Sequence, residues 1–146
     1  MPPSRQTQRI SCYAVIVDSE QLLLVRVSGS DLESKGRWTL PGGGIDFGEH
    51  PDEAVVREVR EETGFAIEAK KLLHVDSNVF EYPDRREHAV LLFYDAQITG
   101  GELQHEQDGS TDLCEWVPLG GIASELLTDV AKIGLGLLLG QTMSPF

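Results

Sequence analysis

Cysteine is scarce in this chain of 146 residues, which contains only Cys12 and Cys114. The two cysteines form no Cys-x-x-Cys pair and belong to no Cys/His cluster, which argues against a disulfide framework and against a structural zinc site. We therefore expect two reduced, partly buried thiols in a cytoplasmic protein.

Long apolar runs are missing as well. The longest run, from Ile133 to Leu139, is interrupted by glycines and is far shorter than the roughly 20 residues that span a bilayer. The first nine residues are polar, with no apolar stretch before Ile10, so no secretory signal is predicted. The sequence therefore predicts no association with a membrane.

Basic residues are few, with 12 Lys and Arg against 24 Asp and Glu, which gives a net charge of −12. Most of such a surface would repel a polyanion, so binding to a nucleic-acid polymer is not expected. Part of the acidic excess is local, because residues 46–62 hold seven acids and two arginines. Divalent cations bound there would neutralise some of this charge and let a small anionic substrate approach.

The length predicts a single domain over residues 1–146. Strand-forming residues at 10–17 and 21–27 flank a polar turn and predict a hairpin, and Pro51 and Gly64 mark the two ends of a helix. Further strands are predicted at 38–40, 67–80, 88–98 and 113–117, with one or two helices over 122–139. Mixed strands with helices before and after them predict an α/β sandwich with a mixed β-sheet.

The predicted helix carries three carboxylates on one face. Glu58, Glu61 and Glu62 stand at positions i, i+3 and i+4, where like charges repel by a few tenths of a kcal/mol per pair. Hard oxygen ligands of this kind suit Mg²⁺ or Mn²⁺. A glycine-rich turn is expected just upstream, at residues 41–44. A divalent ion beside a tight backbone turn is suited to phosphate chemistry.

The same residues carry a family resemblance. The pattern G-x5-E-x7-R-E-U-x-E-E-x-G-U, with U a bulky apolar residue, resembles the Nudix box and covers 23 residues. The flanking W-x-L-P-G-G and W-V-P-L segments are also similar to the family. The positions in register with the box are Gly43, Glu49, Arg57, Glu58, Val59, Glu61, Glu62, Gly64 and Phe65.

The resemblance implies a Nudix-type α/β/α sandwich that hydrolyses a phosphoanhydride bond in a nucleoside diphosphate linked to another moiety, using Mg²⁺ or Mn²⁺. By matching positions, Glu58, Glu61 and Glu62 would be metal ligands and general-base candidates, and the Gly42 carbonyl would add a ligand. Arg57 would hold a neighbouring carboxylate in place. Some family members recruit a base from a later loop. The acids available there are Asp112, which we favour also as a metal ligand, then Glu106, with Asp108 as a further candidate.

Two other functions remain open. A non-catalytic sensor could use the fold to bind a nucleotide metabolite, although no residue of the box is degenerate and we expect no appended effector domain. Isomerisation of a prenyl diphosphate on the same scaffold is disfavoured, because no separate acid/base pair with cysteine is present. The apolar face of the C-terminal helix would suit the interface of a homodimer.

Several residues can be assigned either a structural or a functional role. Glu49 is expected to be a structural partner for the loop and helix start rather than a metal ligand, and Trp116 a core residue. Arg37 is explained equally well as a surface residue and as a phosphate ligand. The Arg85-Arg86 pair is better explained as part of a solvated loop than as a phosphate ligand. Tyr82 is a candidate for stacking on a base.

Overall fold

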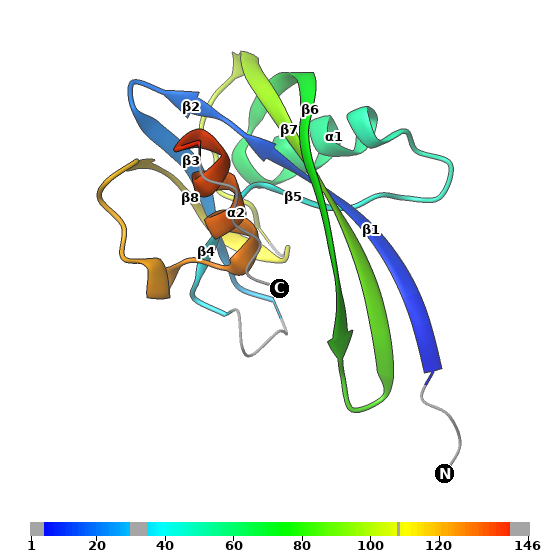
Figure 1. Ribbon diagram of the computed structural model, residues 1–146. Coiled ribbons are helices and arrows are strands. Elements are labelled where there is room, and N and C mark those ends of the chain that lie inside the picture. The colour runs from blue at the N-terminus through cyan, green and yellow to red at the C-terminus, as the bar shows by residue number, and fades with distance from the viewer. Residues whose placement is uncertain (1–4, 30–34, 108, 141–146) are drawn as a thin grey trace.

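A computed structural model describes residues 5–29, 35–107 and 109–140 (Figure 1). In chain order the strands and helices are β1 (Arg5–Val15), β2 (Val17–Asp18), β3 (Gln21–Val27), β4 (Trp38–Thr39), β5 (Gly42–Gly44), α1 (Pro51–Thr63), β6 (Phe65–Glu81), β7 (Arg85–Gly101), β8 (Thr111–Pro118), a 3₁₀ turn (Ser124–Leu126) and α2 (Asp129–Leu138). Within these ranges, no helix is both long and apolar enough to cross a membrane.

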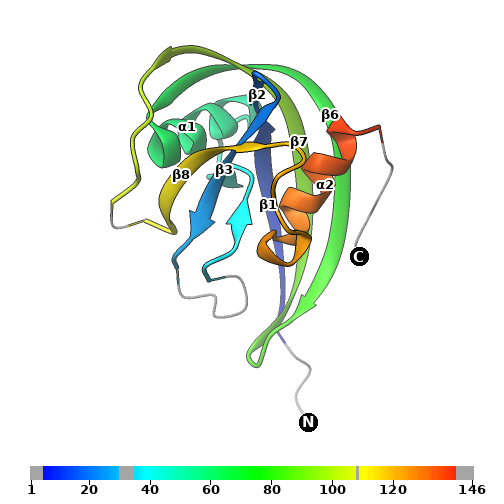
Figure 2. The ribbon, with the colours of Figure 1, turned by 90° about the vertical axis from the view of Figure 1, so that its left-hand side faces the viewer.

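The larger sheet has the strand order β5-β1-β7-β6. β1 runs parallel to β7, whereas β5 and β6 are antiparallel to their neighbours, so the sheet is mixed as predicted. The smaller sheet contains β2, β3 and β4, with β8 paired to β3. Figure 2 shows the strands of this smaller sheet between α1 and α2.

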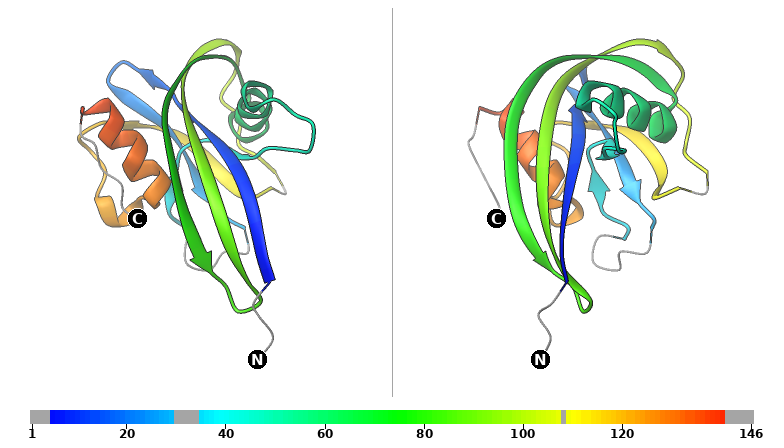
Figure 3. Two further views of the ribbon diagram at one scale, coloured as in Figure 1. Left: turned by 45° about the vertical axis from the view of Figure 1, so that its right-hand side comes forward. Right: turned by 90° about the vertical axis from the view of Figure 1, so that its right-hand side faces the viewer.

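The two helices cover opposite faces of the long strands, as the left view of Figure 3 shows. Val55 and Val59 of α1 are fully buried against Cys12 and Ala14 of β1. On the other face, Ile133 of α2 belongs to a second cluster of buried residues. A helix, a central β layer and a second helix therefore make the α/β/α arrangement that the sequence predicted.

The predicted hairpin over residues 10–27 forms only in part. Its turn is present, with Ser19 and Glu20 at positive φ, but only the two residues of β2 pair with β3. The chain before them continues as β1 into the other sheet. Ala14 faces one core cluster and Val15 the other, and a strand that buries both of its faces belongs in the centre of a structure rather than in an isolated hairpin.

The glycine segment is also different from the prediction, because residues 42–44 form the short strand β5 rather than a turn. They pair with residues 11–13 of β1. Gly42 has φ 153°, and a Cβ on it would overlap the Cys12 carbonyl and lie 2.7 Å from the Tyr13 Cα. Only glycine therefore allows β5 to approach β1 this closely.

Helix α1 begins and ends where the sequence predicted, with Pro51 in the first turn and Gly64 in the left-handed conformation at the end. His50 is the N-cap: its ring Nδ1 accepts a hydrogen bond from the Asp52 amide, and the Glu53 side chain accepts one from the His50 amide. Of the other predicted elements, β6, β7 and β8 are each longer than expected, whereas the 3₁₀ turn and α2 fall within the range predicted for the C-terminal helices.

Candidate active site

The three helix glutamates occupy very different environments. Glu62 is buried, with 2% of its surface exposed. The side chain of Glu58 is 16% exposed and that of Glu61 is 49% exposed. The face that the sequence predicted therefore runs from the interior to solvent.

Glu62 is held by the glycine strand. Its Oε1 accepts a hydrogen bond of 2.7 Å from the Gly42 amide. Burial raises the pKa of the Glu62 carboxyl well above its ordinary value, and although the bond from Gly42 lowers it, the charges of Glu58 and Glu106 raise it further. A cation bound nearby would stabilise the charged form of this carboxylate.

Glu58 lies against the next residue of the strand. A Cβ on Gly43 would be 2.8 Å from the Glu58 Cδ, so glycine leaves the space that the carboxylate fills. Burial raises the pKa of Glu58, Arg57 opposes that rise, and the charges of Glu61 and Glu106 add to it. The charge of Glu58 in turn raises the pKa of Glu62, four residues later on α1.

Arg57 connects the helix to the loop after β5. Its Nε and Nη2 donate to the two carboxylate oxygens of Glu49 at 2.9 and 3.0 Å, and its Nη1 donates to Glu58 Oε1 at 3.0 Å. Its Nη2 also donates to the Gly44 carbonyl at 3.1 Å. The expected contact with a neighbouring carboxylate is therefore present, and it orients the carboxylate of Glu58.

Glu49 has the structural surroundings that the sequence favoured. In addition to the bidentate pair with Arg57, it accepts a bond of 3.1 Å from the Asp46 amide. The bond from Arg57, and then that from Asp46, lower the pKa of Glu49 from 4.5 to about 2. Glu49 therefore fixes the loop before α1 as a permanently charged partner of Arg57.

The surroundings of the loop acids favour a different ranking from the one predicted from the sequence. Asp112 forms a bidentate pair with Arg26, at 2.9 and 2.7 Å, which lowers the pKa of its carboxyl. Glu106 accepts a bond of 2.9 Å from the Thr111 hydroxyl, and its charge raises the pKa of both Glu58 and Glu62. Glu106 is therefore the loop carboxylate electrostatically coupled to the helix, while Asp112 is occupied by Arg26. Asp108 lies outside the described residues.

The donor set fits a hard divalent cation. Within the described ranges, no group of three or more His, Cys, Asp or Glu residues already has a geometry that could hold a metal. The carboxylates beside β5 nevertheless supply hard oxygens, and the pKa values of both Glu58 and Glu62 are raised by burial and by the charges of neighbouring glutamates. Positive charge would relieve that repulsion, and oxygen donors of this kind suit Mg²⁺ or Mn²⁺.

Several other predicted residues have contacts that account for them without a role at these carboxylates. Arg85 stacks over the Tyr82 ring at 4.2 Å, and Arg86 pairs with Glu81 at 2.8 Å. Trp116 packs against a core cluster and contacts the Phe65 ring. The cysteines are free and buried, and burial raises the pKa of Cys12 to about 12, so Cys12 is not a nucleophile at neutral pH.

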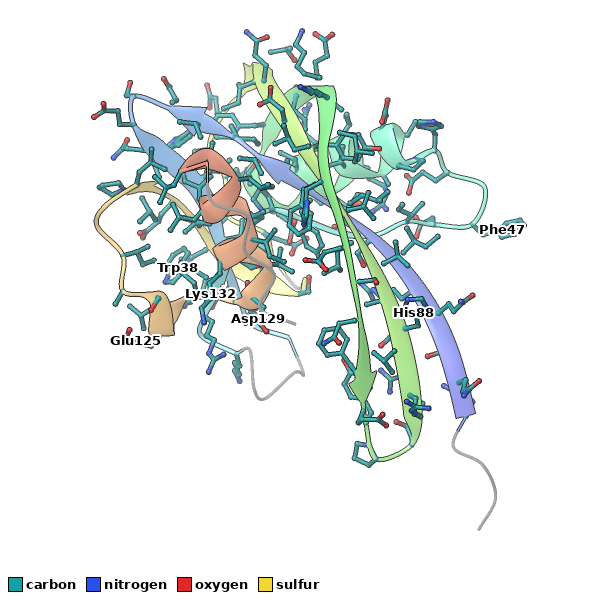
Figure 4. The ribbon with its side chains drawn as sticks, viewed as in Figure 1. Trp38, Phe47, His88, Glu125, Asp129 and Lys132 are labelled. Carbon is teal, nitrogen blue, oxygen red and sulfur yellow. The ribbon has the colours of Figure 1, made fainter. Side chains whose placement is uncertain are left out.

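An open groove of about 720 Å³ adjoins Glu58. It is bounded by the N-terminal part of β1 and by the loop between β5 and α1, and Figure 4 shows Phe47 at the tip of that loop. The residues that line it are Gln8, Arg9, Ile10, Gly44, Ile45, Asp46, Phe47, Gly48, Glu49 and Glu58. Arg9, which lines this groove, and Thr111, which donates to Glu106, belong to no local sequence pattern and are not predicted from the sequence.

A model of the NUDIX domain matches residues 7–134. The chain belongs to the NUDIX domain family. It is 36% identical over 101 residues to a protein of Methanocaldococcus jannaschii named ADP-ribose pyrophosphatase, and the match covers 68% of this chain and 56% of that protein. It is also 36% identical over 108 residues to a Bacillus subtilis protein named putative 8-oxo-dGTP diphosphatase, covering 73% of this chain and 63% of that protein.

A solved structure agrees with this assignment to the Nudix family. The crystal structure of a MutT NUDIX hydrolase from Burkholderia pseudomallei superposes with a TM-score of 0.75 at 27% identity, covering 90% of this chain and 98% of that one. The mixed sheet with a helix on each face is therefore the Nudix fold, and the carboxylate helix α1 is the helix of the Nudix box.

Proposed function

We propose that this chain hydrolyses a phosphoanhydride bond in a nucleoside diphosphate linked to another moiety, with Mg²⁺ or Mn²⁺ as cofactor. The observation that carries the proposal is a set of coupled carboxylates: Glu58 and Glu62 lie against the glycine strand, and the charge of Glu106 raises the pKa of both. The relatives support it, since two are named for the hydrolysis of ADP-ribose and of 8-oxo-dGTP.

Glu58 and Glu62 would hold the ion, together with the exposed Glu61 and the Gly42 carbonyl. Glu106 is a better candidate than Asp112 for an additional ligand from the loop, because Asp112 is already paired with Arg26. When bound, the ion supplies positive charge that polarises the phosphoanhydride and stabilises the charge that develops during cleavage.

The residues of the chain orient the reacting groups. The Gly42 amide fixes the Glu62 carboxylate, and Arg57 fixes that of Glu58, so neither has to be reorganised during the reaction. One of the helix carboxylates takes a proton from the attacking water. Cleavage then releases two phosphorylated products.

The test is a screen of nucleotide derivatives with Mg²⁺ or Mn²⁺, in which products are identified by mass spectrometry. We expect metal-dependent release of a nucleoside monophosphate from at least one compound, and a fall of at least about 100-fold in kcat for Glu58→Gln. Glu68→Gln is the control, because Glu68 is an exposed acid of β6 that pairs with Lys70. Tight binding of a nucleotide without turnover would instead support the sensor function.

A further inference from the structure

Arg9 lies on the opposite side of the glycine strand from Glu58. The Cβ position of Gly44 is 3.2 Å from Arg9 Nη2, whereas the Cβ position of Gly43 is 2.9 Å from the Glu58 oxygens. Adjacent residues of a strand face opposite ways, so the guanidinium and the carboxylate flank β5 on its two faces. Only a narrow ribbon without side chains separates them.

One hydrogen bond holds the Arg9 guanidinium in place, and its other donors remain available. Its Nε donates a bond of 3.1 Å to the Ser11 hydroxyl, and Ser11 is buried. Among the described residues no carboxylate pairs with Arg9, although the chain has twice as many acids as bases. The two Nη groups are therefore left to donate to a ligand.

Arg9 also stands in the groove that reaches Glu58. Of the described residues that line this groove, Arg9 alone is basic, against Asp46, Glu49 and Glu58. Arg57 is nearby, but its donors are occupied by Glu49, Glu58 and Gly44. An anionic substrate that enters the groove meets one available cation, and that cation lies beside the reaction centre.

We propose that Arg9 binds a terminal phosphate of the substrate and thereby selects nucleoside triphosphates over nucleoside diphosphate sugars. A guanidinium fork matches the oxygens of a phosphate in a bidentate manner. The phosphorus of a terminal phosphate carries three unesterified oxygens, whereas each phosphorus of a diphosphate bridge between two sugars carries only two, and these are the ones that metal ions would take. This inference rests on the proposed function and narrows its substrate class.

The test compares Arg9→Gln with Arg5→Gln. Arg5 is the matched control, because it is an exposed arginine four residues earlier on the same strand and the same face. The kinetics of dGTP and ADP-ribose hydrolysis are measured with Mg²⁺ for each protein. Calorimetry with a nucleoside triphosphate that has an imido group between its α- and β-phosphates measures binding without turnover, and circular dichroism checks the fold.

For Arg9→Gln we expect KM for dGTP and Kd for the imido analogue to rise about 10- to 100-fold, as for the loss of a charge-assisted hydrogen bond. The KM for ADP-ribose changes less than about threefold, and Arg5→Gln changes neither by more than about twofold. Arg9→Lys, which keeps the charge but not the fork, falls between the wild type and Arg9→Gln.

Three results would overturn the proposal. The first is an Arg9→Gln protein that binds the analogue as tightly as the wild type, and the second is an equal loss of kcat on both substrates with unchanged binding. The third is a wild type that cleaves ADP-ribose and not triphosphates, which would leave the hydrolase function intact. If the wild type cleaves no compound at all, the proposed function itself fails.

Discussion

Replacing Gly42 and Gly43 by alanine, one at a time, separates the role of β5 in folding from its role at the active site. An alanine at 42 would place its Cβ against the Cys12 carbonyl and 2.7 Å from the Tyr13 Cα, and it would have to adopt φ 153°. The neighbouring atoms are backbone of a central strand and cannot move aside. Backbone strain costs about 1–3 kcal/mol and overpacking about 1–3 kcal/mol, so Gly42→Ala should lose about 4 kcal/mol of unfolding free energy.

Gly43→Ala has a different expected outcome. The atoms that its Cβ meets are the carboxyl group of Glu58, at 2.8 to 2.9 Å, which is the end of a flexible side chain. The carboxylate can move, so the unfolding free energy should change by less than about 1 kcal/mol. A displacement of about 1 Å in a catalytic group costs up to about 100-fold in rate, and we expect a loss in kcat of that order.

Urea denaturation followed by tryptophan fluorescence measures the first effect. With an m-value of about 2 kcal/mol/M, the midpoint of Gly42→Ala should fall by about 2 M. Gly120→Ala serves as the control, because a Cβ there meets no atom within 4 Å. If Gly42→Ala is as stable as the wild type, the close pairing of β5 with β1 is wrong. If Gly43→Ala keeps full activity, Glu58 does not act from its position against Gly43.

Two further predictions concern the charged residues around this strand. Because the pKa of Glu49 is lowered from 4.5 to about 2 by Arg57, its stabilising effect is present above pH 4.5 and is lost as the pH falls toward 2. Thermal melts should therefore show a smaller acid-induced loss of stability for Glu49→Gln than for the wild type. Equal losses would contradict the ion pair. Glu106→Gln should reduce kcat at least about tenfold, whereas Asp112→Asn should change it less than about threefold. If steady-state assays show the larger loss of kcat for Asp112→Asn, Asp112 and not Glu106 is the loop ligand.

Much of the local structure could be predicted from the amino-acid sequence. Pro51 and Gly64 marked the ends of α1, and the spacing of Glu58, Glu61 and Glu62 placed them on one helical face. The Nudix box identified the family, because its residues lie close together in the sequence. These features depend on backbone preferences and on the helical repeat, which are properties of short segments.

What the sequence could not show depends on contacts between distant segments. The predicted hairpin at 10–27 was mostly wrong, because β1 pairs in parallel with β7, more than 70 residues later. The expected turn at residues 41–44 was a strand for the same reason, since β5 exists only by pairing with β1. The pairing of strands far apart in the chain is decided by the burial of both faces in the assembled core.

The sequence by itself therefore determined the family, the helix of the Nudix box and the kind of ligand atoms that it offers, since each follows from residue type and spacing. Only the tertiary structure decided how these atoms differ: Glu62 buried beneath Gly42, Glu58 against Gly43, Glu61 in solvent, and Arg9 across the strand. The physical reason is that burial and the pairing of charges depend on the surroundings supplied by other segments, and these surroundings exist only once the two sheets and the helices have come together.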